Sequence, residues 1–160
     1  PAEATWRSGV DILSFGATKN GAMSAEAVVV FDKKNALKLA NLQKRSGHLF
    51  SKMRYIAAQF EAYLANDLWL RLAAKANLAA DCLAEGLRKC SLLEVLYPVE
   101  SNEVFIRMPE SIANGLMLKG YEFHRWPRSI DTYRFVTSFS TEIVEVKTLI
   151  KATSQLCASN

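Results

Sequence analysis

The stretch VDILSFGATKNG, residues 10–21, decides how the rest of the sequence is interpreted. Its apolar first half, from Val10 to Phe15, predicts a short buried strand that ends at Gly16. A small polar turn follows and closes with an Asn-Gly pair. Lys19 lies in this turn, where burial would disfavour the ammonium form. Such a lysine can supply the free amine that forms an imine with a carbonyl compound.

Two interpretations of Lys19 are open from this spacing alone. The first is an ordinary solvated lysine of a surface turn. The second is the covalent anchor of a carbonyl cofactor, for which pyridoxal 5′-phosphate (PLP) is the commonest choice.

A family resemblance favours the second interpretation. The segment DILSFGATKNG resembles the cofactor-lysine region of the low-specificity threonine aldolases, PLP enzymes that cleave β-hydroxy-amino acids and to which phenylserine aldolase is a near relative. The similarity continues, at spacings like those of that family, through KRSGH (44–48), SKMR (51–54), DLWL (67–70), AN (76–77), SNEVF (101–105) and RFVTSF (134–139). It therefore covers nearly all 160 residues, and the joint match is specific.

The resemblance implies an α/β protein, the C-terminal part of a fold-type-I PLP-dependent transferase fold. Residues 1–66 would end the PLP-binding large domain and its sheet, and residues 67–160 would form an interdomain helix and a small α+β C-terminal domain. In this family the carboxylate for the pyridinium nitrogen, the stacking aromatic ring and the glycine-rich phosphate turn all precede the lysine strand. The chain is therefore expected to be inactive alone and to work in a homo-oligomer, a dimer or tetramer, that contains the missing N-terminal half.

The resemblance also assigns the candidate site residues. Lys19 is the expected Schiff-base lysine, and Thr18 a candidate for holding phosphate, although its hydroxyl can equally satisfy backbone groups. Lys44 matches a lysine that reaches the cofactor phosphate across a subunit interface, and its neighbour Arg45 could serve instead. Arg134 matches the arginine that binds the substrate α-carboxylate with its guanidinium fork.

Four further residues are weaker candidates. Arg107 and Arg125 compete with Arg134 as carboxylate ligands, and His48 could approach the cofactor from a partner subunit. His124, beside Arg125, is expected to be a strand residue at the domain surface. No metal site is expected.

Helical periodicity fills the middle of the chain. Residues 26–31 form a second predicted strand, and Asn35 is the expected cap of a basic helix that stops near Ser46, before Gly47. A second helix is predicted from Ser51, and a third of about six turns follows Asp67, with apolar residues at steps of three and four.

Short strands dominate the last 70 residues. Strands are predicted at 92–97, 104–108, 121–126 and 133–139, and helices at 109–119, stopped by Gly120, and at 141–155. These elements predict an antiparallel sheet with helices on one face.

Composition excludes several classes of protein. The net charge of +4 is spread over the sequence, which argues against a nucleic-acid partner. No apolar run is long enough for a membrane span. Three cysteines, Cys82, Cys90 and Cys157, fit no metal spacing, and a reduced, cytoplasmic chain is the simplest interpretation. Cys82 is expected to be a small buried hydrophobe.

The expected activity is therefore a PLP-dependent lyase reaction that cleaves a β-hydroxy-amino acid to glycine and an aldehyde. Two alternatives remain: a β-eliminating amino-acid lyase of the same fold, which would also use Lys19 and Arg134, and a non-catalytic interaction module.

Overall fold

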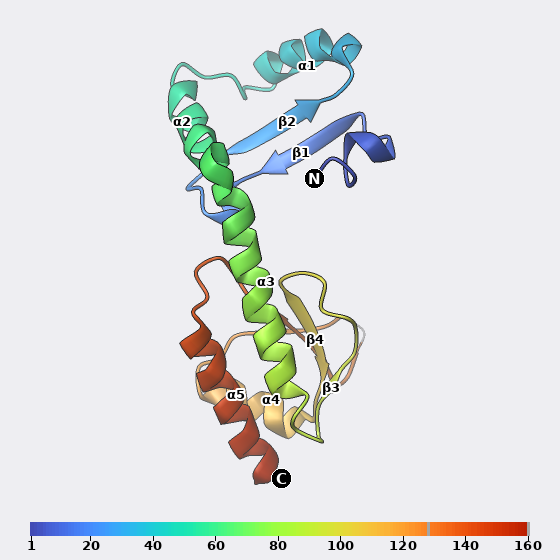
Figure 1. The fold of residues 1–160 in the computed structure, drawn as a ribbon, viewed down its shortest axis with the longest axis vertical. Helices are drawn as coiled ribbons and strands as arrows, with labels where there is room; N and C mark the ends of the chain where they lie inside the picture. The colour runs from blue at the N-terminus through green and yellow to red at the C-terminus, as the bar shows by residue number, and fades with distance from the viewer. Residues whose placement is uncertain (128, 160) are drawn as a thin grey trace. The chain divides into compact units, whose positions relative to one another are not determined.

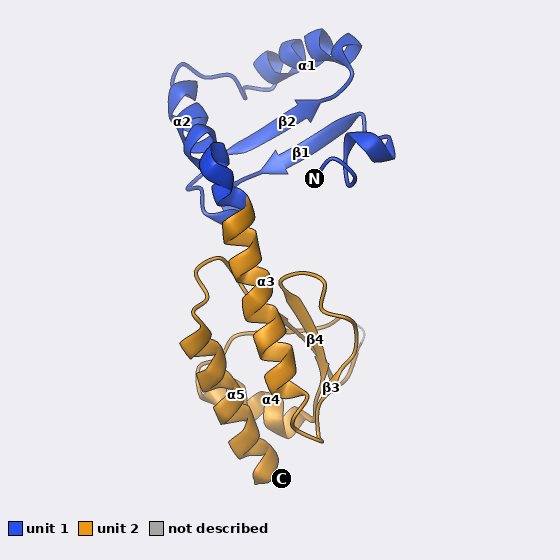
Figure 2. Ribbon diagram, in the orientation of Figure 1, with its two compact units in different colours: residues 1–69 blue, residues 70–160 orange. Residues whose placement is uncertain are grey.

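A computed structural model describes residues 1–127 and 129–159 and divides the chain into two compact units. Unit 1 comprises residues 1–69 and unit 2 residues 70–160 (Figure 2). The boundary between the units falls inside helix α3 (Leu68–Leu87). Among the described residues, no helix is both long and apolar enough to cross a membrane.

Unit 1 contains a two-stranded ribbon and two α-helices (Figure 1). Its elements are η1 (Trp6–Ser8), β1 (Ile12–Gly16), η2 (Thr18–Asn20), β2 (Glu26–Val30), α1 (Lys33–Arg45), α2 (Met53–Leu64) and η3 (Ala65–Asp67). Both predicted strands are confirmed, and they pair antiparallel, with Ile12 opposite Val30 and Gly16 opposite Glu26.

The prediction that the first strand is buried is wrong for this chain. No residue of β1 or β2 is buried, and Ile12 and Val28 keep 47% and 60% of their surface exposed. The physical reason is that β1 pairs with β2 along one edge and has no strand on its other edge among the described residues. The aromatic rings of Phe60 and Trp69 cover Phe15, which lies near the end of the strand.

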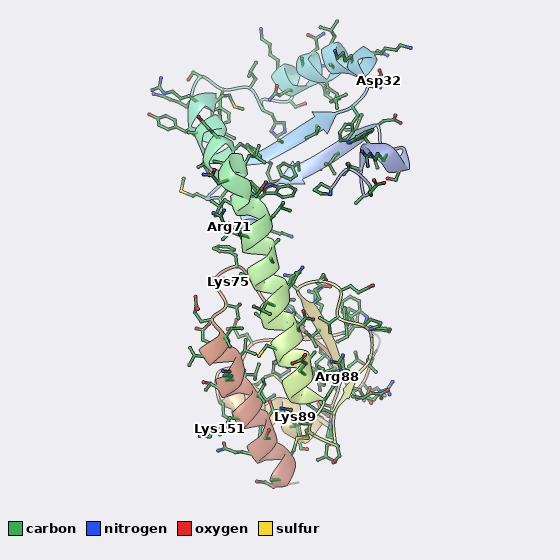
Figure 3. All side chains as sticks on the ribbon, viewed as in Figure 1. Asp32, Arg71, Lys75, Arg88, Lys89 and Lys151 are labelled. Carbon is green, nitrogen blue, oxygen red and sulfur yellow. A yellow bond between two sulfur atoms is a disulfide. The ribbon has the colours of Figure 1, made fainter. Side chains whose placement is uncertain are left out.

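The basic helix α1 begins and ends through local hydrogen bonds. Asp32, labelled in Figure 3, caps it by accepting from the Lys34 N–H at 2.9 Å, so the predicted cap Asn35 is wrong and lies inside the first turn. At the other end Gly47 has φ +75°, its N–H bonds to Lys44 O at 3.3 Å, and the His48 N–H bonds to Gln43 O at 3.0 Å. This is a Schellman closure, and it confirms Gly47 as the helix stop.

The break between the second and third helices is confirmed at Asn66 and Asp67. Both have positive φ, 51° and 56°, which interrupts the helix between Leu64 and Leu68. From Leu68 onward the predicted periodicity holds, and α3 buries Ala76, Ala79, Leu83 and Leu87 among others.

Unit 2 is the predicted antiparallel sheet covered by helices. Its strands are ordered β3 (Glu94–Val95), β4 (Glu103–Arg107), β6 (Thr132–Val136) and β5 (His124–Arg125), and every adjacent pair is antiparallel. Alternate residues of β4 and β6, among them Val104, Ile106, Tyr133 and Phe135, enter the core formed with α3, α4 (Glu110–Leu118) and α5 (Ile143–Ala158). All four predicted strands are present: β4 has the predicted length and starts one residue earlier, and β3, β5 and β6 are shorter than predicted.

The ends of α5 are fixed by polar contacts and by a covalent bond. Glu142 and Glu145 form a capping box at its start, and Lys75 of α3 pairs with Glu142 at 2.6 Å. At its end Cys157 is joined to Cys90 by a disulfide across 67 residues of sequence. The expectation of a fully reduced chain is therefore wrong for these two cysteines, while Cys82 is free and packs, half-buried, against the core.

Gly86 of α3 packs directly against Ile150 of α5. A Cβ at this position would lie 2.3 Å from Ile150 Cδ1 and 2.9 Å from Ile150 Cγ2. Because Ile150 is β-branched and helical, those atoms cannot rotate away freely. We expect Gly86→Ala to lower the free energy of unfolding of the chain by about 1 kcal/mol, since the overpacking outweighs the gain in helix propensity.

Urea denaturation of the full chain tests this prediction. The control places the same change in an Ile150→Ala background, where the clash is absent and Gly86→Ala should be neutral or stabilising. Stabilisation of the wild-type chain by Gly86→Ala would contradict the packing described here.

Candidate functional site

The Lys19 turn is fixed at its base by backbone hydrogen bonds. Ala17, the residue after β1, is fully buried, and its N–H donates to Ala25 O at 2.9 Å. The Thr18 hydroxyl accepts from the Ala25 N–H at 3.1 Å. This bond closes the turn and leaves the O–H of Thr18 as a donor, so its role in holding phosphate stays a prediction.

Asn20, the residue after Lys19, fastens the turn to the helices of unit 1. Its Nδ2 donates to the Tyr63 hydroxyl at 2.6 Å and to Trp69 O at 3.0 Å. Gly21 then takes φ +113°, a conformation that favours glycine. The sequence identified Asn20 only as half of an Asn-Gly turn, because its partners lie 43 and 49 residues away.

A second clamp holds the segment after the turn. The side-chain oxygen of Gln59, on α2, accepts from the backbone N–H groups of Met23 and Ser24, both at 3.1 Å. Ring contacts hold the strand before the turn, since Phe15 lies 6.0 Å from Phe60 and 5.6 Å from Trp69 between centroids. Lys19 is thus carried on a turn whose two flanks are both anchored.

The Lys19 side chain itself is exposed, so the burial on which its assignment from spacing rested is absent in this structure. Among the described residues it has no hydrogen-bond or ion-pair partner. Imine formation with the aldehyde of PLP needs a primary amine that the cofactor can reach, and Lys19 supplies an accessible one. Lys44 is exposed in the last turn of α1 and likewise has no ion pair within the described part of the chain, which suits contact with a phosphate.

Arg134 lies in the middle of β6, opposite Phe105 of β4 and His124 of β5. Its Nη1 donates to Glu103 Oε1 at 3.0 Å, and its guanidinium carbon lies 5.4 Å from the centre of the Trp126 ring. Only 27% of the Arg134 side chain is exposed. An arginine in an apolar strand is expected to have a carboxylate partner, and Glu103 provides one within unit 2.

Arg134 also lines a cleft of about 580 Å³ in unit 2. The other lining residues come from the end of α4, the connection to β5, and the edge of the sheet; they are Met117, Gly120, Tyr121, Glu122, Phe123, His124 and Val136. His124 is exposed on the edge strand, as predicted, and the register β5–β6 places it beside Arg134 in this cleft. No motif in the sequence predicted that His124 and Arg134 are neighbours, because the two residues meet only through strand pairing.

The two rival arginines point to other partners. Arg107 forms ion pairs with Glu94 and, at 3.6 Å, with Asp131. Arg125 pairs with Glu110 at 3.5 Å and donates to Ile130 O. Neither lines the cleft, which leaves Arg134 as its arginine.

Comparison with known proteins finds relatives that align with nearly all of this chain. It is 39% identical over 149 residues to a low-specificity L-threonine aldolase of Pseudomonas sp. (strain NCIMB 10558), a match that covers 93% of this chain and 43% of the relative. The chain is homologous to part of the low-specificity L-threonine aldolases. The same enzyme of Pseudomonas aeruginosa is 37% identical over 151 residues, which cover 94% of this chain and 43% of the relative. No protein-family model matches the chain.

The threonine aldolase homology agrees with the fold. The structure matches Leishmania major threonine aldolase with a TM-score of 0.83 at 24% identity, over 92% of this chain and 44% of that one. The prediction of a fold-type-I PLP-enzyme architecture, over part of such a chain, is therefore confirmed. The chain spans less than half the length of the relatives it matches.

Proposed function

We propose that this chain carries the cofactor lysine and the substrate-carboxylate arginine of a PLP-dependent aldolase that cleaves β-hydroxy-amino acids to glycine and an aldehyde. The observation that carries the proposal is Lys19, an accessible and unpaired amine, among the described residues, on a turn anchored at both flanks. The homology to low-specificity L-threonine aldolases supports the choice of reaction.

Three residues would divide the work on this chain. Lys19 would hold the cofactor aldehyde covalently and release it to the substrate amine, Lys44 would meet the phosphate, and Arg134 would bind the α-carboxylate. When bound, PLP supplies the electron sink that lets the Cα–Cβ bond break. The base for the β-hydroxyl proton and the ring-binding residues would come from the segments that the relatives carry in addition, within a homo-oligomer.

A chimera tests this function. Residues 1–160 replace the homologous segment of the Pseudomonas sp. low-specificity L-threonine aldolase, giving what we call the complemented enzyme. We expect it to release glycine and benzaldehyde from phenylserine in equal amounts. Release of a 2-oxo acid and ammonia would identify the β-eliminating alternative instead. A folded, PLP-loaded chimera without either activity would contradict the proposal and favour a non-catalytic role.

Arg134→Lys in the complemented enzyme tests the carboxylate assignment. Lysine keeps the positive charge but loses the two parallel bonds, which are worth roughly 1–3 kcal/mol at a partly buried site. We expect KM for phenylserine to rise about 10- to 100-fold while the dissociation constant of PLP stays within twofold. Equal weakening of both would instead indicate a structural role for Arg134.

A further inference from the structure

The Arg134 guanidinium is held on two sides by side chains of unit 2. Glu103 accepts from Nη1 at 3.0 Å, and both side chains are largely covered, with 37% of Glu103 and 27% of Arg134 exposed. The Trp126 ring lies under the guanidinium carbon at 5.4 Å. An ion pair and a cation–π contact thus fix both the direction and the plane of the group.

Trp126 is itself held in place by other rings. Its ring meets Phe105 edge to face, with centroids 5.0 Å apart and planes at 90°. Phe105 in turn meets Tyr97 at 5.5 Å and 81°. Phe105 is also the strand partner of Arg134, so the aromatic row and the arginine share one face of the sheet.

Most donors of Arg134 remain unused. A guanidinium carries five N–H donors, and the bond to Glu103 takes one of them. Nε is buried without a hydrogen-bond partner, and Nη2 has none among the described residues. Because a carboxylate accepts two parallel bonds from such a group, Arg134 can bind a second carboxylate while its bond to Glu103 is kept.

We propose that Glu103 and Trp126 are positioning residues: they hold Arg134 so that its remaining Nη1 and Nη2 donors are presented, pre-ordered, to an amino-acid carboxylate in the cleft, while Nε stays buried. The inference rests on the proposed function, because it takes Arg134 as the carboxylate ligand. An unrestrained arginine loses much side-chain entropy on binding, and restraint before binding removes part of that cost.

A double-mutant cycle in the complemented enzyme tests the coupling. Glu103→Ala is expected to raise KM for phenylserine about three- to tenfold with kcat nearly unchanged, since part of the ordering cost returns to binding. In the Arg134→Lys background the same change should raise KM less than twofold. Glu103→Gln, which keeps an oxygen acceptor for Nη1, should restore most of the loss. Equal effects of Glu103→Ala in both backgrounds would overturn the inference.

A second experiment measures how fast the Arg134 Nε–H exchanges with solvent. It uses residues 1–160 and needs neither cofactor nor substrate turnover. The Arg134 Nε–H resonance should exchange slowly with solvent in the wild-type chain, because Nε is buried. We expect Trp126→Ala and Glu103→Ala to speed that exchange at least about fivefold, as the restraint is lost, and Trp126→Phe to preserve it. Backbone amide spectra control for folding. Glu103→Gln, which keeps an oxygen acceptor for Nη1, should leave the exchange rate near that of the wild type, and Trp126→Ala carries the test where Glu103→Ala does not fold. Unchanged exchange in both alanine variants would overturn the inference.

The two proposals fail in different ways. If Arg134→Lys leaves KM for phenylserine unchanged, the carboxylate role of Arg134 fails, whatever the effect of the Glu103 variants on KM. If Arg134→Lys raises KM but Glu103→Ala and Trp126→Ala change neither KM nor the exchange of Nε–H, the positioning role alone fails.

Discussion

Lys19→Arg in the complemented enzyme is expected to abolish cleavage of phenylserine. Arginine keeps the positive charge and similar length but cannot bond covalently to the cofactor aldehyde, because its guanidinium stays protonated. Removing a covalent catalytic group costs many orders of magnitude in related cases, so we expect a loss of roughly a thousandfold or more in kcat. The assay is the release of benzaldehyde at saturating phenylserine and PLP.

The matched control for this change is Lys38→Arg, on the exposed surface of α1. It makes the same substitution of side chain and should leave kcat within twofold. Because Lys19 is exposed and the turn is held by Asn20 and Gln59, Lys19→Arg should also leave the unfolding midpoint unchanged. Cleavage by Lys19→Arg at a rate near that of the control would show that Lys19 is not the catalytic lysine.

Loss of the Cys90–Cys157 disulfide is expected to destabilise unit 2 strongly. The bond closes a long loop, with 67 residues of sequence separation, between the residues just after α3 and the end of α5. In the chain-entropy treatment, opening such a loop in the unfolded state costs roughly 4 kcal/mol of stability. We expect that loss in the Cys90→Ala, Cys157→Ala double variant, measured by urea denaturation of the full chain.

Reduction provides the control for the disulfide. A thiol reductant should lower the stability of the wild-type chain by a similar amount and leave the double variant unaffected. Cys82→Ala should respond to the reductant as the wild type does, since Cys82 is outside the bond. A wild-type chain whose unfolding midpoint does not respond to reduction would contradict the disulfide's contribution.

Local chemistry explains why much of the fold was predictable from the sequence. Gly47 and Gly120 were predicted as helix stops, and both have positive φ. Glycine adopts this conformation without a Cβ penalty, so the residue type alone indicates where a helix can end. The long periodicity of α3 and the strands around Val104 and Tyr133 follow from apolar spacing alone. The cap of α1 is Asp32 and not the predicted Asn35. Both residue types can cap a helix and they lie only three positions apart, so the sequence did not distinguish them.

The features that were missed depend on residues far apart in the sequence. The positions of the three cysteines in the sequence do not show which two are bonded. Cys90 and Cys157 come together only through the packing of unit 2. The bonds from Asn20 to Tyr63 and Trp69, and the placing of His124 beside Arg134, are of the same kind. The burial of Lys19 was expected from an apolar strand, but that strand keeps exposed side chains in this chain.

Locating the PLP attachment site tests the central proposal most directly. The complemented enzyme, which contains the segments that bind the cofactor ring, is incubated with PLP over a range of concentrations, reduced with borohydride, digested, and mapped by mass spectrometry. We predict that the pyridoxyl group appears on Lys19 at lower PLP concentration than on the exposed α1 residues Lys33, Lys34 and Lys38. Labelling of those lysines as readily as Lys19, in a chain that is folded by its amide spectrum, would contradict the assignment of Lys19 as the cofactor lysine.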